Sequence, residues 1–207
     1  MIRKWYDNAV LPRILGCACG NAAIRELRAQ IVPLAKGNVF ELGIGGGLNQ
    51  PFYDRSRVTG LAGVDPAAAM LDRADAAIRD RGWHVDLRQG VGEDIPFASA
   101  GFDTVVCTYT LCSVDAPATV LSELRRVLKP GGCLLYLEHG RAPDNAAARW
   151  QRRIEPVWKR AMGGCHLTRP VAETIRGAGF TTDPIGARYI PRVPRWVGWM
   201  EWGVAVK

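Results

Sequence analysis

The glycine-rich segment 39–49, VFELGIGGGLN, has the residue types and spacing that suggest chemistry most directly. Its glycines stand at alternate positions, and a carboxylate precedes the first of them by two residues; the residues concerned are Glu41, Gly43, Gly45 and Gly47. A dinucleotide-binding turn has the spacing G-x-G-x-x-G, with backbone amides that face a pyrophosphate, but here Leu48 occupies the place of the third glycine. The carboxylate instead favours a ligand that carries positive charge.

Polar residues also follow the other strands that the sequence predicts. Short β-rich apolar runs predict five strands, at 38–42, 60–64, 85–89, 102–107 and 133–137. After them come, in order, the glycine loop with Asn49, then Asp65, then Gly92 with Glu93 and Asp94, then Thr108 with Tyr109, and finally Glu138 with His139. Ligands of open α/β sheets bind outside the carboxyl ends of the strands. The sequence therefore predicts one ligand site to which all five strands contribute.

Several of these residues also have a purely structural interpretation. Asp65 could cap the helix that follows it, and Glu93 could belong to a surface turn. Thr108 and Tyr109 could be ordinary loop residues, and His139 could be a hydrogen-bonded histidine at a strand end. Their shared position after successive strands favours ligand binding.

Helical segments alternate with the strands, which predicts an α/β domain whose parallel sheet is covered on both faces. The predicted helices span 50–54, 67–81, 116–128, 145–162 and 170–178, and residues 187–190 and 199–206 are predicted to form a closing antiparallel hairpin. The LKPGG segment at 128–132 should end one helix and turn the chain into the next strand. The 207 residues are expected to form a single domain.

Composition is that of a globular protein, with 48% hydrophobic and 23% charged residues. The chain contains no apolar run of about 18 residues, and Asp7, Asn8 and Pro12 interrupt its N-terminal segment. Neither a membrane span nor a signal peptide is therefore predicted, and a cytoplasmic location is expected. The six cysteines show no framework spacing, and Cys17 and Cys19 have no partner pair nearby, so we expect no metal site.

The formal net charge of +7 comes from scattered basic residues, with local pairs at 152–153 and 159–160. A solvated basic surface accounts for this charge most simply, and peripheral contact with an anionic membrane is the alternative. No basic run is interleaved with aromatic side chains, so nucleic acid is not an expected partner. The sequence does not determine the oligomeric state.

Four segments together resemble the class I S-adenosylmethionine-dependent methyltransferases: VFELGIGGG, GLAGVDPAAAML, GEDIPFASAGFDTVVC and LRRVLKPGGCLLYLEH. The resemblance covers residues 38–140. It implies a Rossmann-like, doubly wound α/β fold, with a mostly parallel seven-stranded sheet and an antiparallel closing hairpin. It also implies the cofactor S-adenosylmethionine, whose ammonium and sulfonium match the positive charge expected near Glu41.

The resemblance assigns cofactor contacts to particular positions. These are Tyr6, Glu41, Gly43, Gly45, Gly47, Asn49, Asp65, Pro66, Gly92, Glu93, Thr108 and Tyr109. Glu41 and the glycine loop would surround the methionyl part, and Asp65 would bind the ribose hydroxyls. Gly92 and Glu93 would meet the adenine edge. Val91 stands where many relatives carry an acid, so Glu93 is the expected substitute.

The C-terminal third resembles the animal alkyl-thiol methyltransferases and their bacterial relatives, through VVCTYTLCSV, EHGR, WQRRIEPVWKRAMGGCHLTR and GVAVK. It implies methyl transfer to a small thiol or sulfide. The alternative enzyme is a phosphatidylethanolamine N-methyltransferase; a non-catalytic cofactor-binding module and a dinucleotide oxidoreductase are further interpretations. Within the single domain, residues 1–30 would form a helical lid, 38–140 the cofactor-binding core, and 141–207 the acceptor-site cover with the hairpin.

In-line methyl transfer to a thiol requires an aligned acceptor in its thiolate form. His139, which titrates near neutrality at the sheet edge, is the expected base. Cys165 and His166 form a second catalytic group on the segment that would cover the acceptor, although Cys165 could also be a buried structural thiol. Tyr6 would close over the sulfonium through a cation–π contact. One or two of five tryptophans would line an apolar acceptor pocket: Trp150, Trp158, Trp196, Trp199 and Trp202.

Overall fold

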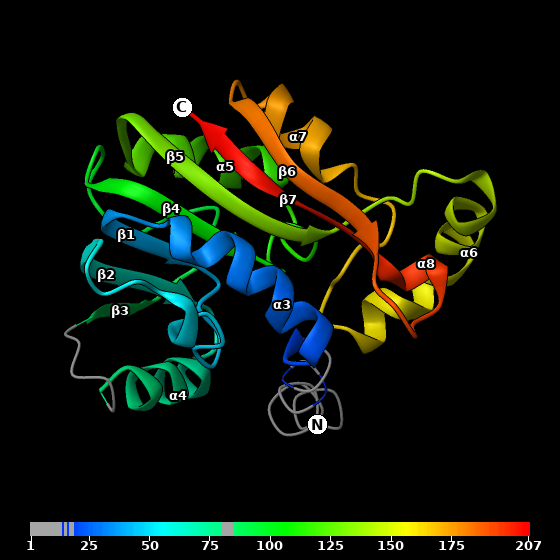
Figure 1. Cartoon of the computed structure of the whole chain (residues 1–207), viewed down its shortest axis with the longest axis horizontal. Helices are drawn as coiled ribbons and strands as arrows, with labels where there is room; N and C mark the ends of the chain where they lie inside the picture. The colour runs from blue at the N-terminus through cyan, green and yellow to red at the C-terminus, as the bar shows by residue number, and fades with distance from the viewer. Residues whose placement is uncertain (1–13, 15, 17–18, 80–84) are drawn as a thin grey trace.

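The computed structural model of the protein describes residues 14, 16, 19–79 and 85–207. Its centre is a seven-stranded sheet with the order β3-β2-β1-β4-β5-β7-β6 (Figure 1). The strands are β1 (Gly37–Leu42), β2 (Val58–Asp65), β3 (Val85–Gln89), β4 (Phe102–Thr108), β5 (Leu128–His139), β6 (Thr181–Tyr189) and β7 (Trp199–Val206). β1 to β5 pair in parallel, and β7 pairs antiparallel with both β5 and β6. The predicted fold class is confirmed.

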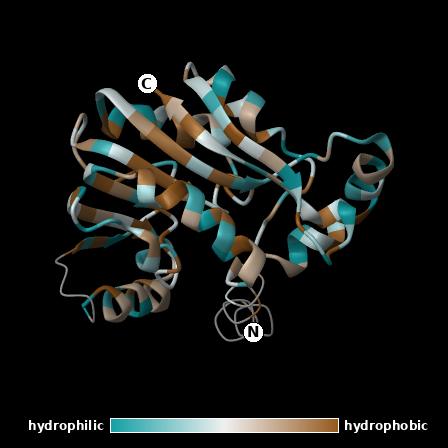
Figure 2. Cartoon of the chain, viewed as in Figure 1, coloured by the Kyte–Doolittle hydropathy of each residue, from teal (hydrophilic) through white to brown (hydrophobic). Residues whose placement is uncertain are grey.

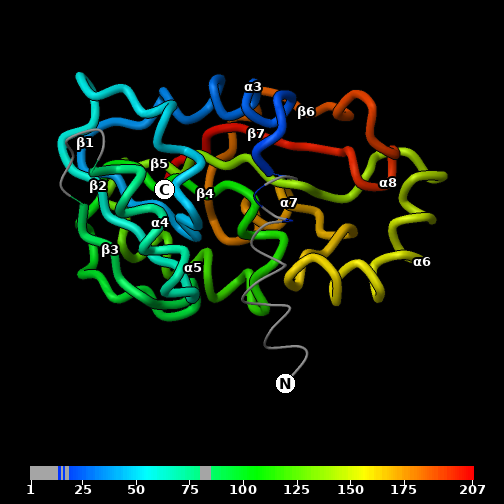
Figure 3. The backbone as a smooth tube through the Cα atoms, turned by 90° about the horizontal axis from the view of Figure 1, so that it is seen from below, coloured from blue at the N-terminus to red at the C-terminus, as the bar shows by residue number. Residues whose placement is uncertain are grey.

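Helices cover both faces of the sheet, as the alternation of segments predicts. Helices α3 (Ala22–Ile31) and α4 (Ala68–Arg79) share one hydrophobic cluster with one side of the strands, and α5 (Pro117–Val127) and α7 (Val171–Gly177) share the cluster on the other side. In the view from below, α3 and α5 lie on opposite sides of the sheet (Figure 3). Hydrophobic residues concentrate in the central strands (Figure 2), because these are covered twice.

Helix α3 turns one apolar face toward the sheet. Ile24, Leu27 and Ile31 are buried there, at the spacing of successive helical turns. The Asn21 side chain caps the helix by accepting the Ile24 backbone N–H at 3.1 Å. Arg28 follows Ile24 by four positions, so it belongs to the same buried face and is only 3% exposed.

Helix α6 (Asn145–Ala161) and the short α8 (Arg195–Gly198) contact each other beyond one end of the sheet (Figure 1). Asp144 caps α6 by accepting the Ala147 backbone N–H at 2.9 Å. After α6 the chain returns to the sheet, where the His166 backbone N–H donates to the Cys112 carbonyl at 2.8 Å. This bond fixes the segment around residue 165 beside the loop that follows β4.

The predicted element boundaries differ from the structure in three regions. β5 begins at Leu128 rather than at the predicted 133, so the LKPGG segment belongs to the strand. The helix expected at 50–54 is only a 3-10 turn at Gln50–Phe52, and a second such turn spans Val32–Leu34. Strand β6 begins six residues before the predicted 187, because it tolerates Pro184 and Gly186. β6 is an edge strand with a register shift between these two residues, where a missing N–H is harmless. Within the described ranges, no helix combines the length and apolar character needed to cross a bilayer.

Candidate active site at the carboxyl ends of the strands

The glycine loop leaves β1 in a tight left-handed course that only glycine adopts without strain. Gly43, Gly45 and Gly47 have φ angles of 64°, 53° and 79°. A Cβ on Gly43 would lie 2.3 Å from the Thr110 hydroxyl oxygen, so no larger residue fits there. The loop therefore brings its backbone close to the ends of β1 and β4.

Glu41 is a buried carboxylate held by three side chains that follow the loop. It is 2% exposed and accepts hydrogen bonds from Asn49 at 2.8 Å, Tyr53 at 2.7 Å and Gln50 at 3.3 Å. Burial raises the pKa of Glu41 to about 7, and the bonds from Tyr53 and Asn49 act in the opposite direction. A cation placed beside this carboxylate would favour its ionised form.

Asp65 ends β2 and connects the loop to the next helix. Its carboxylate accepts the Gly45 backbone N–H at 3.0 Å and the Ala67 backbone N–H at 2.9 Å. Burial raises the pKa of Asp65, against the effect of these two bonds. The bond to Ala67 closes a turn just before α4, which begins at Ala68, so Asp65 does not cap that helix directly. The bond to Gly45 places the carboxylate against the glycine loop. The Pro66 carbonyl, beside it, accepts from Gln89 at 2.9 Å.

Gly92 and Glu93, the two residues of the turn after β3 that were predicted to contact the cofactor, each have a structural role. Gly92 packs so closely that a Cβ would lie 3.1 Å from Val120. The Glu93 carboxylate accepts the Ala116 backbone N–H at 3.2 Å, at the start of α5. Their contact with the adenine edge stays a prediction.

Thr108 and Asn49 meet a residue that sequence reasoning missed. The Arg28 guanidinium donates to the Thr108 hydroxyl at 2.8 Å and to the Asn49 side-chain oxygen, and Asn49 also donates to Thr108 at 3.1 Å. Tyr109, with a left-handed φ of 57°, places its ring 5.7 Å from the guanidinium carbon. The sequence did contain a signal for Arg28. Arg28 follows Ile24 by four positions, so a charged residue occupies a position that the helical pattern assigns to the buried apolar face.

Glu138 organises the loop after β4. It is fully buried, and its carboxylate accepts the backbone N–H groups of Thr110, Leu111 and Cys112 at 2.9, 3.1 and 3.1 Å. Burial raises its pKa to about 7, although these bonds favour the charged form. Glu138 therefore positions the backbone of the site.

His139, the next residue, contacts Cys165, which in turn contacts Cys112. His139 is 4% exposed, and its Nδ1 lies 3.7 Å from the Cys165 sulfur, which in turn lies 3.7 Å from the Cys112 sulfur. Hydrogen bonding between Cys165 and the side chains of Cys112 and His139 lowers the pKa of Cys165 to about 4. The Nε2 atom of His139 is buried and has no hydrogen-bond partner among the described residues.

His166, predicted beside Cys165, points to a different partner. Its Nδ1 lies 3.2 Å from a Glu155 carboxylate oxygen of α6, and Glu155 also accepts the Thr168 backbone N–H at 2.8 Å. Thus His139 and Cys165 are paired with each other, whereas His166 is paired with Glu155. Tyr6 lies outside the described residues. Across the described residues, no group of three His, Cys, Asp or Glu side chains could hold a metal ion.

The tryptophans divide between packing and exposure. Trp158 of α6 stacks edge-to-face on Trp196 of α8, with ring centroids 5.6 Å apart. Trp199 packs in the same manner against Tyr189 at 5.0 Å, whereas Trp150 is 53% exposed. Trp158 also lowers the pKa of Cys165, which places its indole beside that thiol.

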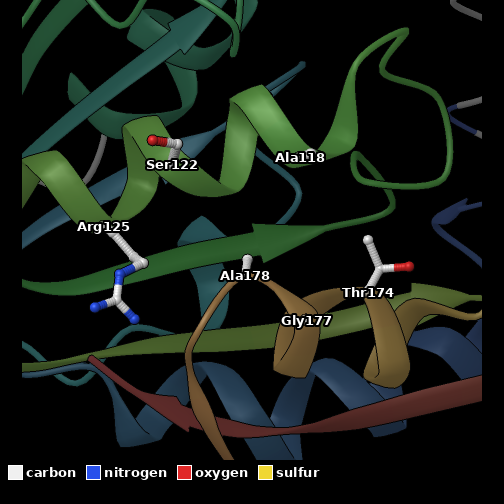
Figure 4. Close-up of a pocket in the computed structure, with 6 residues that line it drawn as sticks. All are labelled: Ala118, Ser122, Arg125, Thr174, Gly177 and Ala178. Atoms are coloured by element: carbon white, nitrogen blue, oxygen red, sulfur yellow. The ribbon is translucent and has the colours of Figure 1, made fainter.

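A shallow cavity of about 270 Å³ lies elsewhere, between α5 and α7 (Figure 4). Ser122, Arg125 and Thr174 supply its polar lining. None of the residues that line it is a predicted site residue. The chemistry-bearing side chains gather instead at the carboxyl ends of the strands.

Comparisons with known proteins agree with this arrangement. A family model described as a methyltransferase domain matches residues 40–136. The chain is 37% identical over 190 residues to the thiol S-methyltransferase TMT1B of Rattus norvegicus, covering 84% of this chain and 76% of that protein. It is 34% identical over 117 residues to a phosphatidylethanolamine N-methyltransferase of Cereibacter sphaeroides, covering 56% of this chain and 57% of that protein.

Solved structures share the fold. An S-adenosylmethionine-dependent methyltransferase from Mesorhizobium loti has a TM-score of 0.67 at 17% identity, covering 91% of this chain and 99% of that one. The one from Thermotoga maritima has a TM-score of 0.66 at 20% identity, covering 100% of this chain and 94% of that one.

The residues of the site fit S-adenosylmethionine by their chemistry. A loop with three left-handed glycines lets the backbone approach a ligand closely, and buried carboxylates at Glu41 and Asp65 suit an ammonium and a pair of ribose hydroxyls. Together with the match to the methyltransferase domain and the similarity to TMT1B, they identify the chain as a class I S-adenosylmethionine-dependent methyltransferase, a member of the family that contains the thiol S-methyltransferases.

Proposed function

We propose that this methyltransferase acts on a small thiol or sulfide. The observation that carries the proposal is the pair of His139 and Cys165, whose Nδ1 and sulfur atoms lie 3.7 Å apart at the carboxyl end of β5. The pair could turn a neutral thiol into the thiolate that methyl transfer requires. The similarity to thiol S-methyltransferases over 84% of the chain supports the same acceptor class.

Cys165 orients the His139 ring in this proposal. The lowered pKa of Cys165 favours its thiolate, and the Cys165 sulfur, 3.7 Å from Nδ1 of His139, can accept a hydrogen bond from an N–H at that atom. The neutral imidazole then keeps its lone pair on Nε2, since a neutral histidine carries one proton. Because Nε2 has no partner in the described part of the chain, it is free to take a proton from the acceptor.

The glycine loop, Glu41 and Asp65 would hold S-adenosylmethionine, which would supply the electrophilic methyl group on its sulfonium. His139 Nε2 would take the proton of the acceptor thiol, leave a thiolate as the nucleophile for that methyl group, and later return the proton to water. The protein aligns the acceptor and excludes water, the two contributions that an in-line displacement needs most.

An acceptor screen tests the proposal. Purified enzyme is incubated with S-adenosylmethionine and sulfide, methanethiol or a longer alkyl thiol, while S-adenosylhomocysteine release and the methylated product are measured. We expect turnover on thiols, and His139→Gln to lower kcat by roughly 10²–10⁴-fold with cofactor binding intact. His166→Gln is the matched comparison, because His166 faces Glu155 instead. Loss of activity in His166→Gln but not in His139→Gln would show that the wrong histidine was chosen.

A phospholipid head-group amine is the second candidate acceptor. The exposed face of α6 carries Trp150 and Val157, which are 53% and 71% exposed, among the arginines Arg149, Arg153 and Arg160. Such a face suits an anionic lipid surface, and a phosphatidylethanolamine N-methyltransferase is among the relatives. Methylation of phosphatidylethanolamine vesicles without turnover of any thiol would favour this acceptor.

A further inference from the structure

Arg28 is a buried cation that forms no direct ion pair with a carboxylate in the described part of the chain, although Glu41 is close enough to interact with it electrostatically. It is 3% exposed, and its hydrogen bonds go to the neutral oxygens of Thr108 and Asn49. Its Nε is buried without a hydrogen-bond partner. A buried charge is ordinarily paired with an opposite charge, because desolvation without such a partner is costly. Among the described residues, the Arg28 guanidinium therefore lacks a directly bonded anion.

The neighbours of Arg28 define where that anion belongs. Asn49 accepts from Arg28 through its side-chain oxygen and donates to Glu41 through its side-chain nitrogen, at 2.8 Å. One amide thus separates a buried positive group from a buried negative one. Thr108, the second partner of Arg28, ends β4 beside the glycine loop. Both charges consequently lie within the cofactor site.

An amino-acid head group carries the complementary pair, with an ammonium and a carboxylate on the same carbon. We propose that Arg28 binds the α-carboxylate of the methionyl part of S-adenosylmethionine, while Glu41 on the other side of Asn49 binds its ammonium. Arg28 then acts as a positioning residue for the cofactor, and α3 is part of the active site. This assignment depends on the cofactor alone, so it stands or falls independently of the acceptor.

The planar guanidinium suits this task better than an ammonium would. It presents donors in a fixed fork that matches the two oxygens of a carboxylate, and its Nε, unpaired in the described structure, supplies a further donor. Asn49 and Thr108 hold the group in place through Nη1. The fork is therefore held in place before the ligand arrives.

The test compares two ligands that differ only in the carboxylate. Calorimetry measures the binding of S-adenosylhomocysteine and of the analogue in which hydrogen replaces its α-carboxylate, with no acceptor present. We expect the wild type to prefer the carboxylate-bearing ligand by roughly 10- to 100-fold, the range of a charge-assisted hydrogen bond or two. In Arg28→Gln this ratio should fall to within about threefold of unity, with little change for the analogue.

Arg25→Met is the matched control, because Arg25 lies on the same helix but is exposed and contacts the Phe52 ring. Its ligand ratio should equal that of the wild type. If Arg28→Gln does not fold, Arg28→Lys is used instead, because it keeps the positive charge and loses the planar fork of donors. In Arg28→Lys the preference for the carboxylate-bearing ligand should fall by at least about fivefold, which corresponds to the loss of roughly one hydrogen bond. A ratio unchanged in the variant that folds, or an equal loss of affinity for both ligands, would overturn the proposal.

Discussion

Replacing Glu41 by glutamine should abolish a proton release that accompanies cofactor binding in the wild type. Burial raises the pKa of Glu41 to about 7, so the free enzyme is a mixture of protonated and ionised forms near neutrality. An ammonium bound beside the carboxylate favours the ionised form and lowers its pKa. Binding should therefore expel the proton from those molecules that carry it.

The pKa sets the size of the effect at each pH. With a folded-state pKa of about 7, binding should release roughly 0.9 proton at pH 6, 0.5 at pH 7 and 0.1 at pH 8. The sign follows from linkage: because binding releases protons, affinity rises with pH by up to about tenfold per unit below pH 7 and levels off above it. In Glu41→Gln the affinity should be lower and almost independent of pH.

Calorimetry in two buffers of different ionisation enthalpy measures the protons released when S-adenosylhomocysteine binds. Asp54→Asn provides the control, because Asp54 is an exposed carboxylate that bonds only to Ser56 among the described residues. The reasoning would be refuted by a wild type that releases no proton between pH 6 and 7. It would equally be refuted by a Glu41→Gln variant that releases as many protons as the wild type.

Three further predictions concern other titratable groups. Asp65→Ala should weaken cofactor binding by about 1–3 kcal/mol if its carboxylate pairs with the ribose hydroxyls. An unchanged affinity in calorimetry would show that Asp65 does not bind the ribose. Cys165 should react with iodoacetamide at a rate that does not depend on pH between 6 and 8, because its pKa is lowered to about 4. In His139→Ala the rate should increase with pH. Mass spectrometry of the labelled peptide measures both rates. The folded state holds a proton on Glu138 up to a pKa of about 7, whereas the unfolded chain loses it near 4.5, so wild-type stability falls as pH rises through this window. Relative to the wild type, Glu138→Gln should therefore gain up to about 3 kcal/mol between pH 4.5 and 8 in urea unfolding, and a constant difference would contradict the buried-acid assignment.

Much of the fold, and the place of the candidate site at one edge of the sheet, was predictable because the signals are local. The alternation of β-rich runs and helical segments determined the sheet. The left-handed φ angles of the loop account for three of its glycines, Gly43, Gly45 and Gly47. The carboxyl ends of parallel strands meet at one edge, so residues placed after each strand could be assigned to one site before the structure was known. Asp65 was assigned to the candidate site in this manner, whereas Glu41 was assigned from its place two residues before the first loop glycine; the cofactor contacts of both stay predictions.

Contacts between segments far apart in the chain were decided by tertiary structure. Arg28 meets Thr108 across 80 positions, and Cys165 meets Cys112 across 53, and no local pattern encodes such pairs. Pro184 and Gly186 predict an interruption, yet β6 continues through them because it lies at the edge of the sheet. Packing also separated neighbours, since Cys165 faces His139 whereas His166 faces Glu155. The sequence alone thus determined the elements and the residues at their ends, while the burial and pairing that set their charge states depend on the folded core, where desolvation acts.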